Sequence, residues 1–334
     1  MRDANLATRL NLVGSFSVSA ARKYLQNVIG RDRPGQATTQ KQLLVDVSVI
    51  IANDARTGIQ RVVRALLLQL LQQPPAGYQV RPVFANRKNG YRYAPDLFSQ
   101  PNPHSLSMHE ADSVKVQRGD VFLGLDLAAH ILPRHKAQLG NWKRVGVYIH
   151  IFVYDLLPLL YPQWFNPKTS KNFLRWTKTL AVFADSIICI SHTVKDQIDG
   201  WLLRRYKLPP GTIPIHVVKL GSDIQASAPS HGLPADIDGV MGALFGRRSL
   251  LMVGTVEPRK GHDQVLDAFS ELWRLGCDVN LIIVGKPGWK TQALQKSLRS
   301  HPELHKHLHW FEDASAKTSA RPGFSNQASQ QLSD

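Results

Sequence analysis

The chain has 334 residues, of which 43% are hydrophobic and 20% are charged. These values are ordinary for a globular protein of about two domains, and no stretch approaches the roughly 20 apolar residues that a membrane-spanning helix needs. The net charge of +16 favours anionic partners such as phosphates, nucleic acid or a membrane surface. We rank nucleic acid last and do not expect it as a partner, because the basic residues are spread out and no zinc-finger spacing or RNA-binding aromatic signature accompanies them.

The first 42 residues form a basic leader that we expect to be disordered. Its mild apolar run at residues 10–18 is interrupted by Asn11, Gly14 and Ser15, so it does not fit a signal peptide. Cys189 and Cys277 lie far apart in apolar surroundings, which predicts two buried thiols in a reducing cytoplasm.

From residue 43 onward, strand and helix patterns alternate. Continuous apolar runs predict buried parallel strands at residues 43–51, 79–85, 121–125, 144–153, 186–190 and 213–218. Apolar residues at helical spacing predict helices at residues 59–71, 168–184 and 194–205, the last with Ser191 as its N-cap. The alternation predicts a doubly wound α/β domain over residues 43–221, whose site lies in the loops after the strands.

Residues 222–248 are rich in Gly, Pro, Ala, Ser and Asp and predict a linker. A second α/β domain then begins over residues 249–313. Its predicted strands and helices lie at residues 249–253, 263–275, 279–284, 291–300 and 307–311. We expect this domain to be incomplete, because three strands leave an open edge and little core. The tail at 314–334 lacks periodicity and is expected to be disordered.

The segment GTVEPRKGH at residues 254–262 follows a predicted strand and leads into a helix. Backbone N–H groups and the helix N-terminus favour an anion there, and Arg259 and Lys260 add two cationic donors. The spacing is neither that of a Walker loop nor that of a dinucleotide fingerprint. From the spacing alone, a diphosphate site and a surface loop with solvated charges are about equally supported.

Residues 251–263, 266–269 and 281–289 resemble the donor domain of retaining glycosyltransferases of family 4, also called group 1. Residues 57–62, 154–158 and 189–191 agree with the same family, and the resemblance covers most of residues 43–315. It implies a GT-B fold, in which two Rossmann-like, doubly wound domains face a cleft, with the second domain incomplete in this chain.

The implied activity is transfer of a hexose of the mannose or rhamnose type from a nucleotide-diphosphate sugar, with GDP-mannose as one candidate donor. The acceptor would be a lipid-linked or polysaccharide glycan in O-antigen biosynthesis, and no metal or other cofactor is implied. The basic surface and leader suit a cytoplasmic protein in peripheral association with the anionic inner face of the membrane.

The resemblance assigns the donor diphosphate to Arg259 and Lys260, whose charge would stabilise the leaving group. It places four further residues near the nucleotide: Gly254, Glu257, Gly285 and Lys286.

In the N-terminal domain, Thr57 and Gly58 open the first helix, where a backbone-lined loop would approach the donor phosphate. Arg61 is either a further phosphate contact or a solvated arginine. Asp155 and Tyr154 are candidate contacts for sugar or acceptor at a strand end. His150 is a second catalytic candidate, although a histidine within a strand is more often a core residue.

The family continues with a loop that carries two glutamates seven residues apart, whereas the last glutamate of this chain is Glu312. We therefore expect a truncated chain, and the alternative function is an inactive relative that retains only acceptor binding. Asp236 and Asp238 match the Asp-x-Asp metal motif but fall in the predicted linker, which favours a solvated turn. A metal site is also not expected at the clustered histidines, because they lack a neighbouring Cys or carboxylate pattern. These are His301, His305, His307 and His309.

Overall fold

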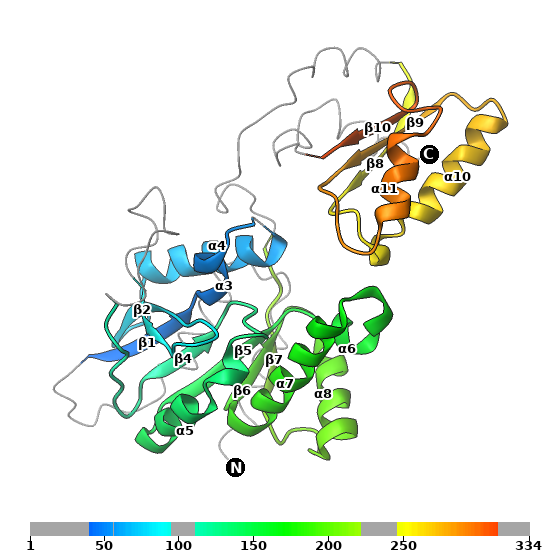
Figure 1. The fold of residues 1–334 in the computed structure, drawn as a ribbon. Helices are drawn as coiled ribbons and strands as arrows, with labels where there is room; N and C mark the ends of the chain where they lie inside the picture. The colour runs from blue at the N-terminus through cyan, green and yellow to red at the C-terminus, as the bar shows by residue number, and fades with distance from the viewer. Residues whose placement is uncertain (1–39, 56, 95–110, 222–245, 313–334) are drawn as a thin grey trace. The chain divides into compact units, whose positions relative to one another are not determined.

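The computed structural model describes residues 40–55, 57–94, 111–221 and 246–312, and it divides into two compact units (Figure 1). Unit 1 comprises Met1–Pro162 and Pro167–Ser227, and unit 2 comprises Gln163–Asn166 and Ala228–Asp334. Both units are built from parallel strands and helices, so the predicted α/β fold class is confirmed. Most of the predicted leader, most of the predicted linker and the predicted tail lie outside the described residues. The end of the predicted leader is wrong, because Lys41 and Gln42 begin the first strand.

Unit 1 contains a seven-stranded sheet in the order β3-β2-β1-β4-β5-β6-β7. Its strands are β1 (Lys41–Asp46), β2 (Tyr78–Phe84), β3 (Arg92–Tyr93), β4 (Val121–Gly124), β5 (Tyr148–Val153), β6 (Ser186–Cys189) and β7 (Ile215–Val217). Neighbouring strands are parallel except for β2 and β3. The strand order reverses between β1 and β4, and the loops at the carboxyl ends of such a pair are where ligands of doubly wound sheets bind.

Helices cover both faces of this sheet. They are α3 (Ser48–Ala52), α4 (Gly58–Gln72), α5 (Lys136–Val145), α6 (Leu157–Leu160), α7 (Pro167–Phe183) and α8 (His192–Tyr206), with 3-10 turns η2 (Leu132–Arg134) and η3 (Pro162–Trp164). Figure 1 shows α3 and α4 on one face and α5, α7 and α8 on the other, each over its own apolar core. Ser191 accepts the Val194 N–H at 3.2 Å and caps α8 as predicted. None of the described helices has the length and apolarity needed to cross a bilayer.

The predicted strand at residues 43–51 is wrong in its second half, because β1 ends at Asp46 and α3 follows. The Asp46 carboxylate accepts the Ser48 N–H at 2.9 Å, which turns the chain. The Asp126 carboxylate then accepts the N–H groups of Val49 and Ile50, both at 2.8 Å, in the first turn of α3. The apolar run therefore continues through a strand, a turn and a helix.

The predicted strand at residues 144–153 is wrong in its first residues, which belong to the unpredicted helix α5. Gly146 ends this helix in a left-handed conformation with φ of 99°, and its N–H donates to the carbonyls of Trp142 and Lys143. Such a glycine directly after a helix that ends in basic residues is a frequent stop signal. Strand β5 starts only at Tyr148.

Unit 2 contains three parallel strands in the order β10-β9-β8. Its elements are β8 (Arg248–Val253), η5 (Pro258–Lys260), α10 (His262–Arg274), β9 (Val279–Val284), α11 (Gln292–Arg299) and β10 (Leu308–Phe311). Leu266 and Phe269 of α10 and Leu298 of α11 pack with strand residues in a small core. These elements agree with the predicted ones to within about two residues at each end.

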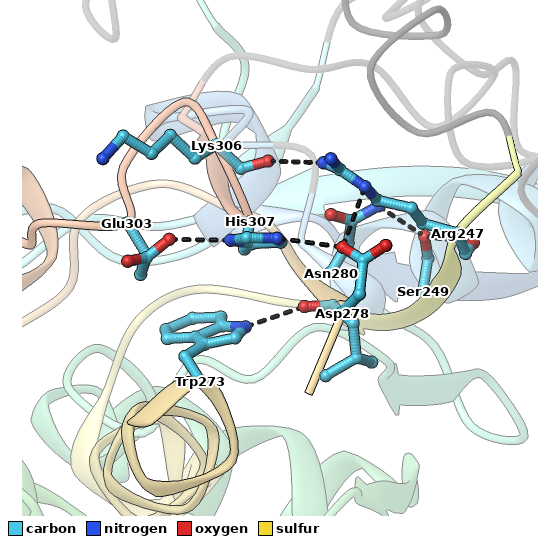
Figure 2. Close-up of polar contacts among 9 residues, drawn as sticks. Arg247, Ser249, Trp273, Asp278, Asn280, Glu303, Lys306 and His307 are labelled. Atoms are coloured by element: carbon cyan, nitrogen blue, oxygen red, sulfur yellow. Dashed lines mark hydrogen bonds and ion pairs between the residues drawn. The ribbon is translucent and has the colours of Figure 1, made fainter. Parts of the chain in front are cut away.

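Polar contacts join the amino ends of the three unit 2 strands (Figure 2). His307, just before β10, contacts Glu303 through Nδ1 at 2.7 Å and Asp278 through Nε2 at 3.0 Å. Asp278, just before β9, also pairs with Arg247 at 2.9 Å, beside the start of β8. Both ring nitrogens of His307 thus contact carboxylates within unit 2. The described residues contain no group of three or more His, Cys, Asp or Glu side chains placed to hold a metal ion.

The two thiols differ in burial. Cys189 is buried in β6, as predicted, and burial raises its pKa to about 12. Cys277 is exposed, so the prediction for it was wrong. It follows Gly276 in the turn between α10 and β9, ahead of the apolar strand that suggested burial.

Two buried carboxylates, Asp46 and Asp126, lie where the strand order of unit 1 reverses between β1 and β4. Asp46 accepts the Tyr91 hydroxyl at 2.8 Å in addition to its contacts with Ser48. Burial raises the pKa of Asp46 to about 7, with the nearby charge of Asp126 as the second cause. Burial also raises the pKa of Asp126 to about 6. Because the folded protein holds the Asp46 proton more tightly than the unfolded chain, this contribution to stability exists at low pH and is lost as pH rises through about 7.

We predict that Asp46→Asn weakens the pH dependence of stability. Wild-type protein should lose free energy of unfolding between about pH 4 and pH 7, and the variant should lose on the order of 2–4 kcal/mol less. Urea unfolding at a series of pH values measures this difference. Asp196→Asn removes an exposed carboxylate from α8 and should follow the wild type. Parallel curves for wild type and Asp46→Asn would contradict the prediction.

Candidate functional site

Two loops lie side by side at the carboxyl edge of the unit 2 sheet. One follows β8 at residues 254–261 and the other follows β9 at residues 285–291. The Gly254 N–H donates to the Val284 carbonyl at 2.8 Å, and the Val256 N–H donates to the Lys286 carbonyl at 3.0 Å. The two loops thus continue the parallel pairing of their strands past the end of the sheet.

The close approach of these loops requires glycine. A Cβ atom on Gly285 would lie 1.9 Å from the Gly254 carbonyl oxygen, and one on Gly288 would lie 2.4 Å from the Val256 carbonyl oxygen. Both contacts are with backbone, which cannot swing away as a flexible side chain would. Gly254 and Gly261 also have positive φ values, of 143° and 69°, a region that other residues rarely adopt.

Further hydrogen bonds fix this pair of loops to the rest of unit 2. The Thr291 hydroxyl donates to the Val256 carbonyl at 2.9 Å, and the Trp310 indole donates to the Gly285 carbonyl at 2.9 Å. The Gly285 N–H donates to Phe311 of β10 at 2.9 Å. The backbone around Gly254 and Gly285 is therefore held in place from three strands.

Arg259 and Lys260 lie on the short turn η5, at the rim of this pair of loops. The Arg259 guanidinium forms an ion pair with Glu257 at 2.6 Å. Lys260 lies against Gly254, since its Nζ would be 3.8 Å from a Cβ built there. Both cations are exposed, and both precede the N-terminus of α10, where unpaired backbone N–H groups favour anions.

Glu257 does not fit the predicted nucleotide contact. Its side chain is 3% exposed, and its carboxylate is committed to Arg259. The carboxylate instead orients the guanidinium, because one fixed ion pair restricts a long side chain that would otherwise sample many rotamers. Lys286, by contrast, is exposed at the start of the second loop.

His262 is a member of this region that the sequence prediction missed. It is the first residue of α10 and is only 2% exposed, yet neither ring nitrogen has a hydrogen-bond partner among the described residues. Burial lowers its pKa, and the charge of Lys260 lowers it further. A buried polar group without a partner costs free energy and calls for an explanation. Its position in the motif was visible in the sequence, but its burial was not.

The predicted residues of the first helix lie at the start of α4 in unit 1. Thr57 caps this helix, because its hydroxyl accepts the Gln60 N–H at 3.3 Å while the Gln60 side chain accepts the Thr57 N–H at 3.1 Å. A Cβ on Gly58 would meet nothing within 4 Å, so space is open beside it. Arg61 is half-buried and has no ion-pair partner in the part of the chain that the structure describes.

Tyr154 and His150 do not fit the contact roles predicted for them, since both are core residues. The Tyr154 hydroxyl donates to the Leu125 carbonyl at 2.8 Å, and the side chain is 3% exposed. His150 lies within β5 with Nδ1 at 2.7 Å from the Ser186 hydroxyl, and burial lowers its pKa to about 4. Asp155 is half-exposed and accepts the Leu157 N–H at 3.1 Å, so it stays a candidate at the end of β5. The Asp236 and Asp238 motif lies outside the described residues.

Comparison with known proteins finds similarity to a family in unit 2 and to curated proteins over most of the chain. Residues 244–318 match the family model "Glycosyl transferases group 1". The chain is 39% identical over 279 residues to the serotype-specific mannosyltransferase WbdA of Escherichia coli, and the match covers 82% of this chain and 33% of that protein. Another E. coli protein with the same description is 37% identical, with coverage of 85% and 35%. The chain therefore spans about a third of the length of these curated relatives.

Among solved structures, the chain is similar to Anabaena Alr3699/HepE in complex with UDP and glucose. It has 17% sequence identity and a TM-score of 0.43, with coverage of 82% of this chain and 69% of that chain.

We predict that Gly285→Ala destabilises unit 2 by more than about 2 kcal/mol, because the added methyl group would overlap the Gly254 backbone. The matched control is Gly276→Ala, where φ is 81° but no atom lies within 4 Å of the new Cβ; it should cost about 1 kcal/mol from backbone strain alone. Hydrogen exchange of the β8 and β9 amides reads out both variants. Equal protection in the two would show that the loops tolerate the side chain.

Proposed function

From the match of residues 244–318 to the group 1 glycosyl transferase model, we propose that unit 2 binds the diphosphate of a nucleotide sugar. The observation that carries this proposal is the position of Arg259 and Lys260 on η5, directly before α10 and beside the Gly254–Gly285 contact. Two cations and the N-terminus of a helix then converge on one exposed turn, which suits an anion with two phosphates.

The loops also offer backbone to the ligand. Positions where a side chain would collide with neighbouring backbone are bare, as at Gly285 and Gly288, and bare backbone permits the approach of a phosphate to N–H groups. Glu257 keeps Arg259 in one orientation before the ligand arrives. Pre-orientation lowers the entropy lost on binding.

We propose that the chemistry is hexosyl transfer. The bond between the sugar anomeric carbon and the diphosphate oxygen breaks, and its electron pair leaves with the nucleotide diphosphate. A hydroxyl of the acceptor forms the new bond to the anomeric carbon and gives its proton to the departing diphosphate oxygen. Arg259 and Lys260 stabilise the charge that grows on the leaving oxygen, which lowers the barrier. Asp155 remains the candidate contact for sugar or acceptor in unit 1.

The proposed donor is a mannose nucleotide such as GDP-mannose, used without a metal or other cofactor, and the product linkage retains the anomeric configuration. The proposed acceptor is a lipid-linked or polysaccharide glycan of the cell surface, such as an O-antigen. The mannosyltransferase description of the E. coli relatives supports the sugar class. The net charge of +16 supports work in the cytoplasm at the anionic inner face of the membrane.

We predict that Arg259→Ala and Lys260→Ala each weaken nucleoside diphosphate binding roughly 10- to 100-fold, because each removes a charge-assisted hydrogen bond. Calorimetric titration with GDP and with UDP measures the loss. The control is Arg274→Ala, which removes an exposed arginine from the opposite end of α10. A loss of affinity as large in Arg274→Ala, or unchanged affinity in the other two, would argue against the proposed site.

His262→Leu separates stability from binding. We propose that the bound diphosphate, or the loop as it closes on it, supplies the partner that the imidazole lacks. The variant should therefore keep or raise the Tm, because a buried polar group without a partner is removed, while its affinity for GDP falls roughly tenfold. Thermal unfolding and calorimetry on the same protein give both values. A stable variant with unchanged affinity would remove His262 from the site.

A further inference from the structure

A pocket of about 310 Å³ opens in unit 1 next to η2 and α7. Its polar lining is His130, Arg134, Lys136, Asn172 and Arg175. The volume falls at the lower end of the range of about 300–1,000 Å³ typical of small-molecule sites. No role in the proposed donor site involves any of these residues.

The fold builds this pocket at a place where ligands of doubly wound sheets are found. His130 and Arg134 lie in the segment after β4, the strand at which the sheet order reverses. The turn η2 packs against α7, which brings Asn172 and Arg175 to the same pocket. Helix α5 begins at Lys136, and its N-cap residue provides no side-chain hydrogen bond to the first turn.

Among the described residues, the three cations that line the pocket are not paired with a carboxylate. Within the described ranges, no ion pair involves Arg134, Lys136 or Arg175. The nearest acidic residue along the segment is Asp126, which is buried and hydrogen-bonded to backbone N–H groups of α3. Like charges gathered without a counterion raise the local concentration of anions and favour their binding.

The surrounding positive charge also affects the pKa of the His130 imidazole. Burial lowers its pKa first, and the charges of Arg87, Arg134 and Lys168 lower it further. These three cations come from the loop after β2, from η2 and from α7. An anion in the pocket would offset their effect and favour the protonated ring.

The composition of the lining favours phosphate over other anions. Arg134 and Arg175 each present a planar fork of donors, which suits two oxygens of one phosphate. Lys136 and Asn172 add donors from different elements, so a group with several oxygens in three dimensions can be met from several sides. A nucleic acid would need an extended track of cations along its backbone, whereas this cluster lines a single half-open pocket.

We propose that this pocket binds a phosphate or diphosphate group, carried either by a soluble phosphate ester or by a lipid diphosphate. The inference rests on the pocket and its cations in unit 1, and it stands whether or not unit 2 binds a nucleotide sugar.

The test uses the full chain with Arg259→Ala and Lys260→Ala, so that the proposed donor turn does not compete for the ligand. Inorganic pyrophosphate is added while the ring signals of His130 are followed by NMR. We expect His130 to shift and its pKa to rise on binding. Adding Arg134→Gln and Arg175→Gln should weaken pyrophosphate binding by at least about tenfold.

The matched control adds Arg144→Gln and Arg205→Gln, which remove two exposed arginines of unit 1 outside the pocket lining. It should bind pyrophosphate within about twofold of the parent, and thermal unfolding should confirm that both quadruple variants are folded. Farnesyl diphosphate distinguishes the sources: tighter binding than pyrophosphate assigns the site to a lipid diphosphate, and equal binding assigns it to a soluble phosphate group. The proposal would be overturned if the His130 ring signals did not shift with pyrophosphate, or if the control lost as much pyrophosphate affinity as the pocket variant. It would also be overturned if the His130 signals shifted with an RNA oligonucleotide but not with pyrophosphate.

Discussion

The contact between the Gly254 and Gly285 backbones is the constraint on which unit 2 depends. Because a Cβ on Gly285 would lie 1.9 Å from the Gly254 carbonyl oxygen, the two loops meet only where side chains are absent. This contact extends the pairing of β8 with β9 beyond the sheet and sets where η5 and the start of α10 lie. Arg259 and Lys260 lie on η5, so the packing of the Gly254 and Gly285 backbones also determines where these two cations lie.

The cations of the two units are arranged by different means. In unit 2 a buried Glu257 orients Arg259, and an imidazole without hydrogen-bond partners lies at the next helix start. In unit 1, Arg134, Lys136 and Arg175 form no ion pair with any described residue. The buried Asp46 and Asp126 accept hydrogen bonds from backbone and hydroxyl groups where the strand order reverses. The surplus of +16 thus includes specific clusters as well as a diffuse surface field.

The sequence predicts most elements, because strand and helix periods are local properties of the chain. It fails where a tertiary partner decides: α3 depends on the carboxylate of Asp126, which lies 76 residues from Ile50. The spacing and a family resemblance predict a site at the loop around Arg259, whereas the burial of Tyr154 and His150 follows from packing that no motif records. The sequence shows that His262 belongs to the motif. It does not show that the ring is buried without a hydrogen-bond partner among the described residues.

The most direct test of the account is hydrogen exchange of the chain with and without GDP-mannose. The account predicts that the nucleotide sugar slows exchange at residues 254–262 and 285–291, the two loops that carry the cations and the bare glycine backbone. Protection at those residues by GDP alone would assign the effect to the diphosphate and nucleoside. Unchanged exchange there at saturating GDP-mannose, with protection appearing elsewhere or nowhere, would contradict the account.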